Sequence, residues 1–302
     1  MASPITDYAD KVAVITGGAS GVGLALGRAL ITGGAHVVVA DVEDSALERA
    51  VESLSSTAAT KVVGVRTDVT SADSVRALAD HAFASFGRVN VLFNNAGVGA
   101  PSAKVWETTP NDWHWVNAVN LFGVVYGAQA FVPRMIESGE PGYVVNTTSG
   151  DGAIAPMPTA APYAASKAGV AIVTECLEFQ LREIDANIGA GLLFPAGRGL
   201  IATGMWTADR NRPEKWDRER PRPPVSPEVQ AMKERAQQAA SDNRAVFEAA
   251  LDELANAVLD GIVAGNYVLT LGEFAPSVTR LRERADRYEQ MRNPLGDLAG
   301  AH

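Results

Sequence analysis

The chain has 302 residues, of which 47% are hydrophobic and 20% charged, and its formal net charge is −9. This composition is typical of a globular protein with a sizeable core, and the negative charge argues against a nucleic-acid partner, whose phosphates the surface would repel. No apolar run approaches the roughly 18 residues of a membrane helix, and Met1 to Asp10 lacks a signal-peptide core, so we expect a cytoplasmic protein with no membrane partner. The single cysteine, Cys176, excludes an internal disulfide, and its apolar surroundings predict a buried thiol. The four histidines are scattered singly, so we expect no metal in the chemistry.

The first two thirds of the chain alternates short β-branched runs with longer helical patterns. The predicted strands are Lys11–Thr16, His36–Asp41, Lys61–Thr67, Val89–Phe93, Gly142–Thr147 and Ile188–Phe194. The predicted helices between them are Gly21–Thr32, Glu43–Ser55, Ser71–Phe86, Asn111–Ile136 and Ala161–Ile184. Continuous apolar strands separated by helices are typical of a parallel sheet that is covered on both faces. The sequence therefore predicts an α/β, doubly wound Rossmann fold, whose ligands bind beyond the carboxyl ends of the strands.

The pattern changes after Phe194. Residues 198–235 carry nine Lys and Arg against six Asp and Glu, and five prolines fall between Pro213 and Pro227. Proline disfavours regular structure, so we expect a long loop with short helices, either a substrate lid over 198–245 or a solvated surface excursion.

The last part of the chain returns to regular patterns. Asn243–Ala264 predicts a helix and Tyr267–Leu271 a short strand, which makes about seven strands in one domain covering 1–302. The tail, 275–302, carries an apolar stripe at helical spacing, which packs on its own subunit or joins a partner: Val278, Leu281, Ala285, Tyr288 and Met291.

A glycine-rich loop follows the first predicted strand, where residues 16–23 read Thr-Gly-Gly-Ala-Ser-Gly-Val-Gly and open a helix. Glycines allow a tight turn and let backbone N–H groups approach a pyrophosphate at the helix N-terminus, although a plain glycine turn would look the same. Asp41 ends the second strand, 18 residues after Gly23. A carboxylate there accepts hydrogen bonds from an adenosine ribose and repels a 2′-phosphate, so we expect NAD rather than NADP; the alternative is a helix cap near Glu43.

Tyr163 and Lys167 are spaced four residues apart in a predicted helix and so lie on one face of it. A cation beside a phenol favours the phenolate and lowers its pKa, which yields an acid/base group, although chance also produces such pairs.

Taken together, these motifs resemble the short-chain dehydrogenase/reductase family over roughly residues 8–195. The glycine-rich loop, the run Asn94-Asn95-Ala96-Gly97 and the pair Asp68 and Val69 match its cofactor-binding segments. The resemblance implies a catalytic tetrad of Asn120, Ser149, Tyr163 and Lys167. It also implies a set of cofactor-binding residues: Gly17, Ser20, Gly21, Val22, Gly23, Asp41, Val42, Asp68, Val69, Asn94, Ala96, Gly97, Tyr163, Lys167, Pro195 and Thr203.

The same resemblance implies a reaction, in which a secondary alcohol and its ketone are interconverted by hydride transfer with NAD. Tyr163 would exchange the hydroxyl proton, Ser149 would hold the substrate oxygen, Lys167 would lower the pKa of Tyr163, and Asn120 would support a proton-relaying water. A homodimer or homotetramer is implied through the fourth and fifth predicted helices. The run after Pro195 departs from the family's pattern, since Ala196 stands where a glycine is usual and Thr203 comes late.

The substrate is indicated only by weaker signals. The run Asn211-Arg212-Pro213-Glu214 and the ending Gly272-Glu273-Phe274 are similar to bacterial members that oxidise aryl secondary alcohols, including lignin-derived ethers. A set of apolar residues suits a bulky apolar or aromatic substrate, although packing of the lid on itself would need the same residues: Met157, Pro158, Met205, Trp206 and Trp216. Two other functions remain open on the same scaffold, an epimerase and a catalytically silent NAD-binding protein.

Overall fold

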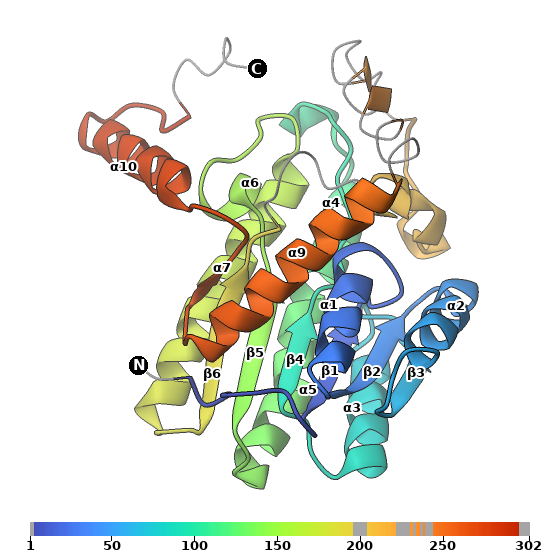
Figure 1. Ribbon diagram of the computed structural model, residues 1–302. Coiled ribbons are helices and arrows are strands. Elements are labelled where there is room, and N and C mark those ends of the chain that lie inside the picture. Colours follow the sequence, from blue (N-terminus) through green and yellow to red (C-terminus); the bar gives the residue numbers. More distant parts are fainter. Residues whose placement is uncertain are drawn as a thin grey trace.

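The computed structural model describes residues 3–195, 204–221, 230–231, 234–235, 238 and 244–295. Its centre is a seven-stranded sheet in the order β3-β2-β1-β4-β5-β6-β7, with every neighbouring pair parallel (Figure 1). The strands are β1 (Val12–Thr16), β2 (His36–Asp41), β3 (Val62–Arg66), β4 (Val91–Asn94), β5 (Gly142–Thr147), β6 (Ile188–Leu193) and β7 (Val268–Leu269). The predicted doubly wound fold is confirmed.

Helices cover both faces of this sheet. One face carries α1 (Gly21–Thr32), α2 (Asp44–Ser55) and α9 (Arg244–Val263), and α9 lies along α1 in Figure 1. The other face carries α3 (Ala72–Phe86), α4 (Pro110–Asn117), α5 (Gly123–Ser138) and α7 (Ala161–Glu183). A short helix, α6 (Gly150–Ala153), and the last helix, α10 (Ala275–Glu289), complete the regular elements considered below.

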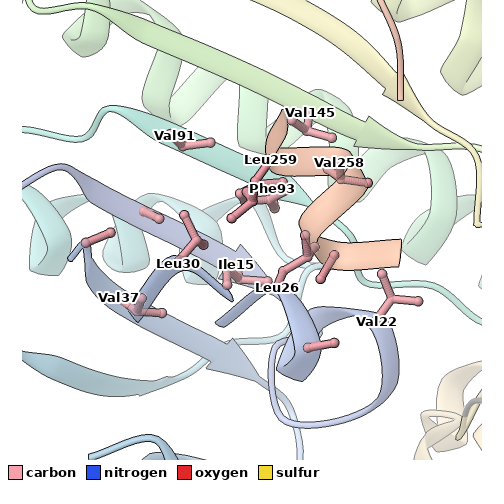
Figure 2. Close-up of a cluster of buried hydrophobic side chains, with 14 of the residues drawn as sticks. Ile15, Val22, Leu26, Leu30, Val37, Val91, Phe93, Val145, Val258 and Leu259 are labelled. Atoms are coloured by element: carbon pink, nitrogen blue, oxygen red, sulfur yellow. The ribbon is translucent and has the colours of Figure 1, made fainter. Parts of the chain in front are cut away.

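The central strands are buried on both sides, and their alternation divides the core in two. In β1, Ala13 and Ile15 pack with α1 and α9, whereas Val12 and Val14 pack on the opposite face with α3 and α5. Figure 2 shows the first of these clusters, where Leu26 and Leu30 of α1 meet Val258 and Leu259 of α9 over β1 and β4. Because successive strand residues point to opposite faces, a continuous apolar run contributes side chains to both cores. The strands predicted from such runs are therefore confirmed.

The predicted helix Asn111–Ile136 is confirmed as one continuous helical stretch, Pro110–Ser138, which contains a π-helical turn. The chain forms α4, then a π-helical turn (Ala118–Phe122), then α5. Asn120 lies in that turn, is fully buried and bonds to the backbone of Val98, so a long-range contact accompanies the π-helical turn. Within the described residues, the whole stretch Pro110–Ser138 is the one helix long and apolar enough to cross a membrane, and 56% of its most apolar window is buried in the protein, as in a core helix.

One further prediction needs correction. Cys176 is exposed rather than buried, and it shares one face of α7 with Ile172 and Phe179, which are also exposed. The apolar pattern of α7 is therefore wider than the face that packs in the monomer. The tail does form a helix, α10, but none of its residues is buried, and it stands apart from the layers in Figure 1.

Candidate active site

A cavity of about 840 Å³ lies at the carboxyl ends of the strands. It is bordered by the loops that follow β1, β2, β3, β4, β5 and β6, so residues far apart in the sequence meet there. Of the residues predicted from the sequence, the following line it: Gly17, Ser20, Gly21, Val22, Asp41, Val42, Asp68, Val69, Ala96, Gly97, Ser149, Tyr163, Lys167 and Pro195. Thr203 lies outside the described residues.

The glycine-rich loop is packed too closely for side chains at three positions, Gly17, Gly18 and Gly23. Gly17 has φ +62°, and a Cβ added to it would come 2.8 Å from Cα of Ala96. A Cβ on Gly23 would come 2.3 Å from the carbonyl oxygen of Gly17, because α1 begins directly against the loop. Ser20, the N-cap of α1, makes no capping hydrogen bond with its side chain. The first N–H groups of α1 therefore face the cavity as an anion site.

Asp41 holds the adjoining wall with both of its carboxylate oxygens. One accepts the N–H of Ala19 in the glycine-rich loop at 3.2 Å, and the other accepts the N–H of Glu43 at 3.2 Å. Glu43 is the N-cap of α2 and Asp41 precedes it, so Asp41 makes a turn rather than capping the helix. Each oxygen keeps a lone pair for a ribose hydroxyl.

The run Asn94–Gly97 lies against the glycine-rich loop. The hydroxyl of Thr16 accepts the N–H groups of Asn95 and Ala96, at 3.0 and 3.2 Å, and the side chain of Asn95 donates to the carbonyl oxygen of Thr16 at 3.0 Å. Asn94 points the other way, into the sheet, where it donates to Asn146 at 2.8 Å.

Gly23 and Asn94, which the sequence also predicts to bind the cofactor, are not among the described residues that line the cavity. Gly23 allows helix α1 to approach the loop, and Asn94 ties β4 to β5. Both residues thus support the wall of the cavity without lining it.

Tyr163, Lys167 and Ser149 converge on the cavity from three sides. Tyr163 lies in the first turn of α7, and Lys167 lies one turn later, with its Nζ 6.0 Å from the centre of the Tyr163 ring. Nζ of Lys167 donates to the carbonyl oxygen of Thr147, at the end of β5, at 2.7 Å. Ser149 caps α6, accepts the N–H of Asp151 at 3.2 Å and hydrogen-bonds the hydroxyl of Tyr163.

The pKa of Tyr163 moves opposite to the sequence-based expectation. Burial raises it, the nearby Asp151 carboxylate raises it further, and only the hydrogen bond from Ser149 lowers it. Lys167 is 3% exposed, and burial lowers the pKa of its ammonium to about 8. The apolar surroundings that raise the pKa of the Tyr163 phenol thus also lower the pKa of the Lys167 ammonium.

Asn120 stands behind this group. Its side chain accepts the N–H of Val98 at 2.8 Å and donates to the carbonyl oxygen of Val98 at 3.0 Å and to the hydroxyl of Ser166 at 3.1 Å. A methyl group added at Gly97 would lie 3.5 Å from Oδ1 of Asn120 and 3.6 Å from Nζ of Lys167. Both amide hydrogens of Asn120 are thus used within the protein, so its side chain ties the loop at Val98 to Ser166 of α7.

Sequence reasoning missed several lining residues, of which Asp151 is the most consequential. Asp151 lies two residues after Ser149, and burial raises the pKa of its carboxyl while Arg280 of α10 lowers it. Glu43 was assigned only to a helix, and Arg66 only to a strand, yet both line the cavity. No spacing rule links these positions to the motifs, because their distance from the site is set by the fold.

Segment 204–221 crosses the cavity between α4 and α2. Met205 lines it, and Ala208 is buried with the core residues Trp115 and Val119. Arg212, 5% exposed, binds the buried Asp112 of α4 at 2.9 Å, and Asn211 donates to Glu43 at 2.7 Å. The run 211–214, which carried the weaker resemblance, therefore anchors the segment to the body of the protein.

The apolar substrate residues predicted from the sequence are only partly found at the cavity. Met157 and Met205 line it, whereas Pro158 is not among its described lining residues. Trp216 packs against the core face of α4, so the packing interpretation holds for it.

Comparisons with known proteins agree with this geometry. A family model described as short chain dehydrogenase matches residues 11–212. A C alpha-dehydrogenase from Sphingobium sp. strain SYK-6 is 37% identical over 211 residues, which are 70% of this chain and 67% of that protein. The crystal structure of a short chain dehydrogenase/reductase from Burkholderia phymatum in complex with NAD is 36% identical, with a TM-score of 0.84, and the match covers 96% of this chain and 98% of that one. A metagenomic short-chain oxidoreductase in complex with NADP is 29% identical, with a TM-score of 0.58 over 63% of this chain and 83% of that one.

Proposed function

The chain belongs to the short-chain dehydrogenase/reductase family, and we propose that it is an NAD-dependent oxidoreductase that interconverts a secondary alcohol and its ketone. One observation carries the proposal: Ser149, Tyr163 and Lys167 line the same cavity as the glycine-rich loop and Asp41. Side chains able to exchange a proton thus share one cavity with a loop of the kind that binds a dinucleotide.

The residues present fit NAD. Gly17 leaves no room for a side chain against Ala96, so its backbone can closely approach a pyrophosphate at the start of α1. Asp41 accepts ribose hydroxyls and repels a 2′-phosphate, and residues 16–23 contain no Lys or Arg. The related structure from Burkholderia phymatum, which contains NAD, supports the same cofactor, whereas the metagenomic relative contains NADP.

The side chains divide the chemistry among them. Bound NAD would supply the acceptor for the hydride that leaves the carbinol carbon. Tyr163 takes the hydroxyl proton during oxidation and returns it during reduction, while Ser149 holds the substrate oxygen. Lys167, with a pKa of about 8, still carries its charge at neutral pH, and its bond to Thr147 keeps Nζ beside the catalytic group.

The substrate we propose is a bulky apolar or aromatic secondary alcohol. The lining of the cavity includes Met157, Met205, Trp115 and Val119, whose side chains are apolar. The 37% identity to a C alpha-dehydrogenase supports the resemblance to bacterial dehydrogenases of aryl alcohols.

The test is a panel of aryl and alicyclic secondary alcohols incubated with NAD or NADP, with reduced cofactor followed by absorbance. We expect NADH to form with the aryl alcohols, and more slowly or not at all with NADP. Faster turnover with NADP would refute the cofactor assignment. An epimerase would convert substrate without net NADH, so a product assay on the same samples separates that alternative.

We also propose that the protein assembles as a homodimer or homotetramer through α5 and α7. Ile172 and Phe179 of α7 are 59% and 61% exposed, and they lie with Cys176 on one helix face. Burying such a face against a second copy removes it from water. Light scattering on eluting protein is expected to show an oligomer that Phe179→Glu dissociates; a monomeric wild-type protein would contradict the proposal.

A further inference from the structure

Two arginines border the end of the cavity where Asp41 lies. Arg66, at the end of β3, and Arg210, in segment 204–221, both line the cavity beside Asp41, Val42 and Glu43. A cation at this corner would ordinarily favour a cofactor with a 2′-phosphate, since Arg binds phosphate through two parallel hydrogen bonds. The corner therefore holds positive side chains that conflict, at first sight, with a preference for NAD.

Both arginines are paired with acidic residues at the start of α2. Arg66 binds Asp44 at 3.2 Å, in a pair that is largely exposed. Arg210 binds both carboxylate oxygens of Glu43, through Nε at 3.3 Å to one and through Nη2 to the other. Arg210 also donates to the hydroxyl and carbonyl oxygen of Thr207, at 2.7 and 2.8 Å, so its guanidinium is held in one place.

Glu43 is well placed to control what Arg210 binds. Its backbone N–H is bonded to Asp41, and its side chain also accepts from Asn211 at 2.7 Å. The Glu43 side chain is 28% exposed and that of Arg210 is 44% exposed, so the pair lies at the rim of the cavity, where a ligand competes with it.

We propose that Glu43 is a second determinant of cofactor choice, which acts beside Asp41 by occupying Arg210 and so denying that arginine to a 2′-phosphate. The inference rests on the proposed function, because it places the adenosine ribose at Asp41. It assigns the Arg210–Asn211 corner of segment 204–221 to the adenosine end of the site rather than to the substrate end. Segment 204–221, which lines the cavity for the substrate, thereby also contacts the adenosine end of the cofactor.

The test compares binding of NAD and NADP by calorimetry, without substrate, in the wild-type protein, Glu43→Gln, Arg210→Gln and the double variant. Glu43→Gln keeps the shape of the side chain and removes one negative charge, so NADP is expected to bind about tenfold tighter while NAD changes little. Arg210→Gln alone is expected to weaken binding of NADP, because the Glu43 carboxylate is then left unpaired near the 2′-phosphate. The double variant is expected to lose the gain in NADP binding that Glu43→Gln brings. The gain should shrink as salt is added, because both groups are partly exposed.

The matched control is Glu48→Gln, which removes the same charge from an exposed position on the same helix. An equal gain for NADP in that variant would show a general charge effect and overturn the proposal. Equal weakening of NAD and NADP in Glu43→Gln would also overturn it, since Glu43 would then serve only to hold the segment. Failure of the wild-type protein to bind either dinucleotide would instead refute the proposed function itself.

Discussion

At the scale of single residues, Tyr163 is surrounded by groups that act on its proton in opposite directions. Burial and the Asp151 carboxylate raise its pKa, and the hydrogen bond from Ser149 lowers it. Lys167 is buried within reach of the same ring, at the cost of a lowered pKa of its own. The pKa of Tyr163, the base of the proposed reaction, is therefore set by a few neighbouring residues, and each of them can be tested by substitution.

Replacing Tyr163 by Phe removes the acid/base hydroxyl and keeps the ring. A general base of this kind contributes about 10²–10⁴-fold, so turnover is expected to fall by that order while NAD binding persists. Steady-state rates and a separate binding titration measure the two effects. Turnover close to that of the wild-type protein would exclude Tyr163 as the base.

Asp151→Asn is expected to move the pH profile of alcohol oxidation. The active base is the phenolate, so kcat/KM rises as the pH passes the pKa of Tyr163. Removing the Asp151 charge lowers that pKa, and the rise should then begin at lower pH. Asp286→Asn, on exposed α10, serves as the control that leaves the profile in place. A rise that begins at the wild-type pH in Asp151→Asn would contradict the coupling.

At the scale of elements, the N-terminus of α4 ties segment 204–221 to the core. Asp112 forms a capping box with Thr109, in which each backbone N–H is bonded to the other residue's side chain. The same carboxylate, 1% exposed, lies 2.9 Å from both Arg212 and Arg218. Arg212 also stacks over the ring of Trp115, 5.1 Å from its centre. One buried acid thus caps a helix and holds the segment that covers the cavity.

Asp112→Asn is expected to lower the free energy of unfolding by about 3 kcal/mol, because two largely buried guanidinium groups lose the charge they face. Urea denaturation of the variant measures this, with Asp217→Asn, an exposed acid in the same segment, as the control. Loss of less than about 1 kcal/mol would mean that the segment is held by its apolar contacts instead.

At the scale of the whole molecule, one hydrophobic core packs on each face of the sheet and holds the strand ends in register. Helix α10 lies outside both cores. Phe274, just before α10, packs edge-on against Phe194 with ring centres 5.0 Å apart. Beyond that contact, α10 exposes Leu281 and Tyr288, and Met291 just after the helix is also exposed. Its electrostatic link to the site runs from Arg280 to Asp151.

Ending the chain after Pro276 removes α10 and keeps the Phe274 contact. Because no residue of α10 is buried, the free energy of unfolding of the monomer is expected to change by less than about 1 kcal/mol. Thermal unfolding and light scattering on the truncated protein check stability and assembly separately. A large loss of stability with assembly unchanged would contradict this account of α10.

The sequence by itself determined the doubly wound sheet, the glycine-rich loop and the positions of Asp41, Ser149, Tyr163 and Lys167, because apolar periodicity and short spacings are local properties. Only the tertiary structure decided which of these groups line the cavity, and it leaves Gly23 and Asn94 outside the described lining. It also decided the direction of the Tyr163 pKa shift and the pairing of Arg210 with Glu43, which are 167 positions apart in the chain. Burial and long-range ion pairs depend on the distance between atoms, and that distance exists only after the chain has folded.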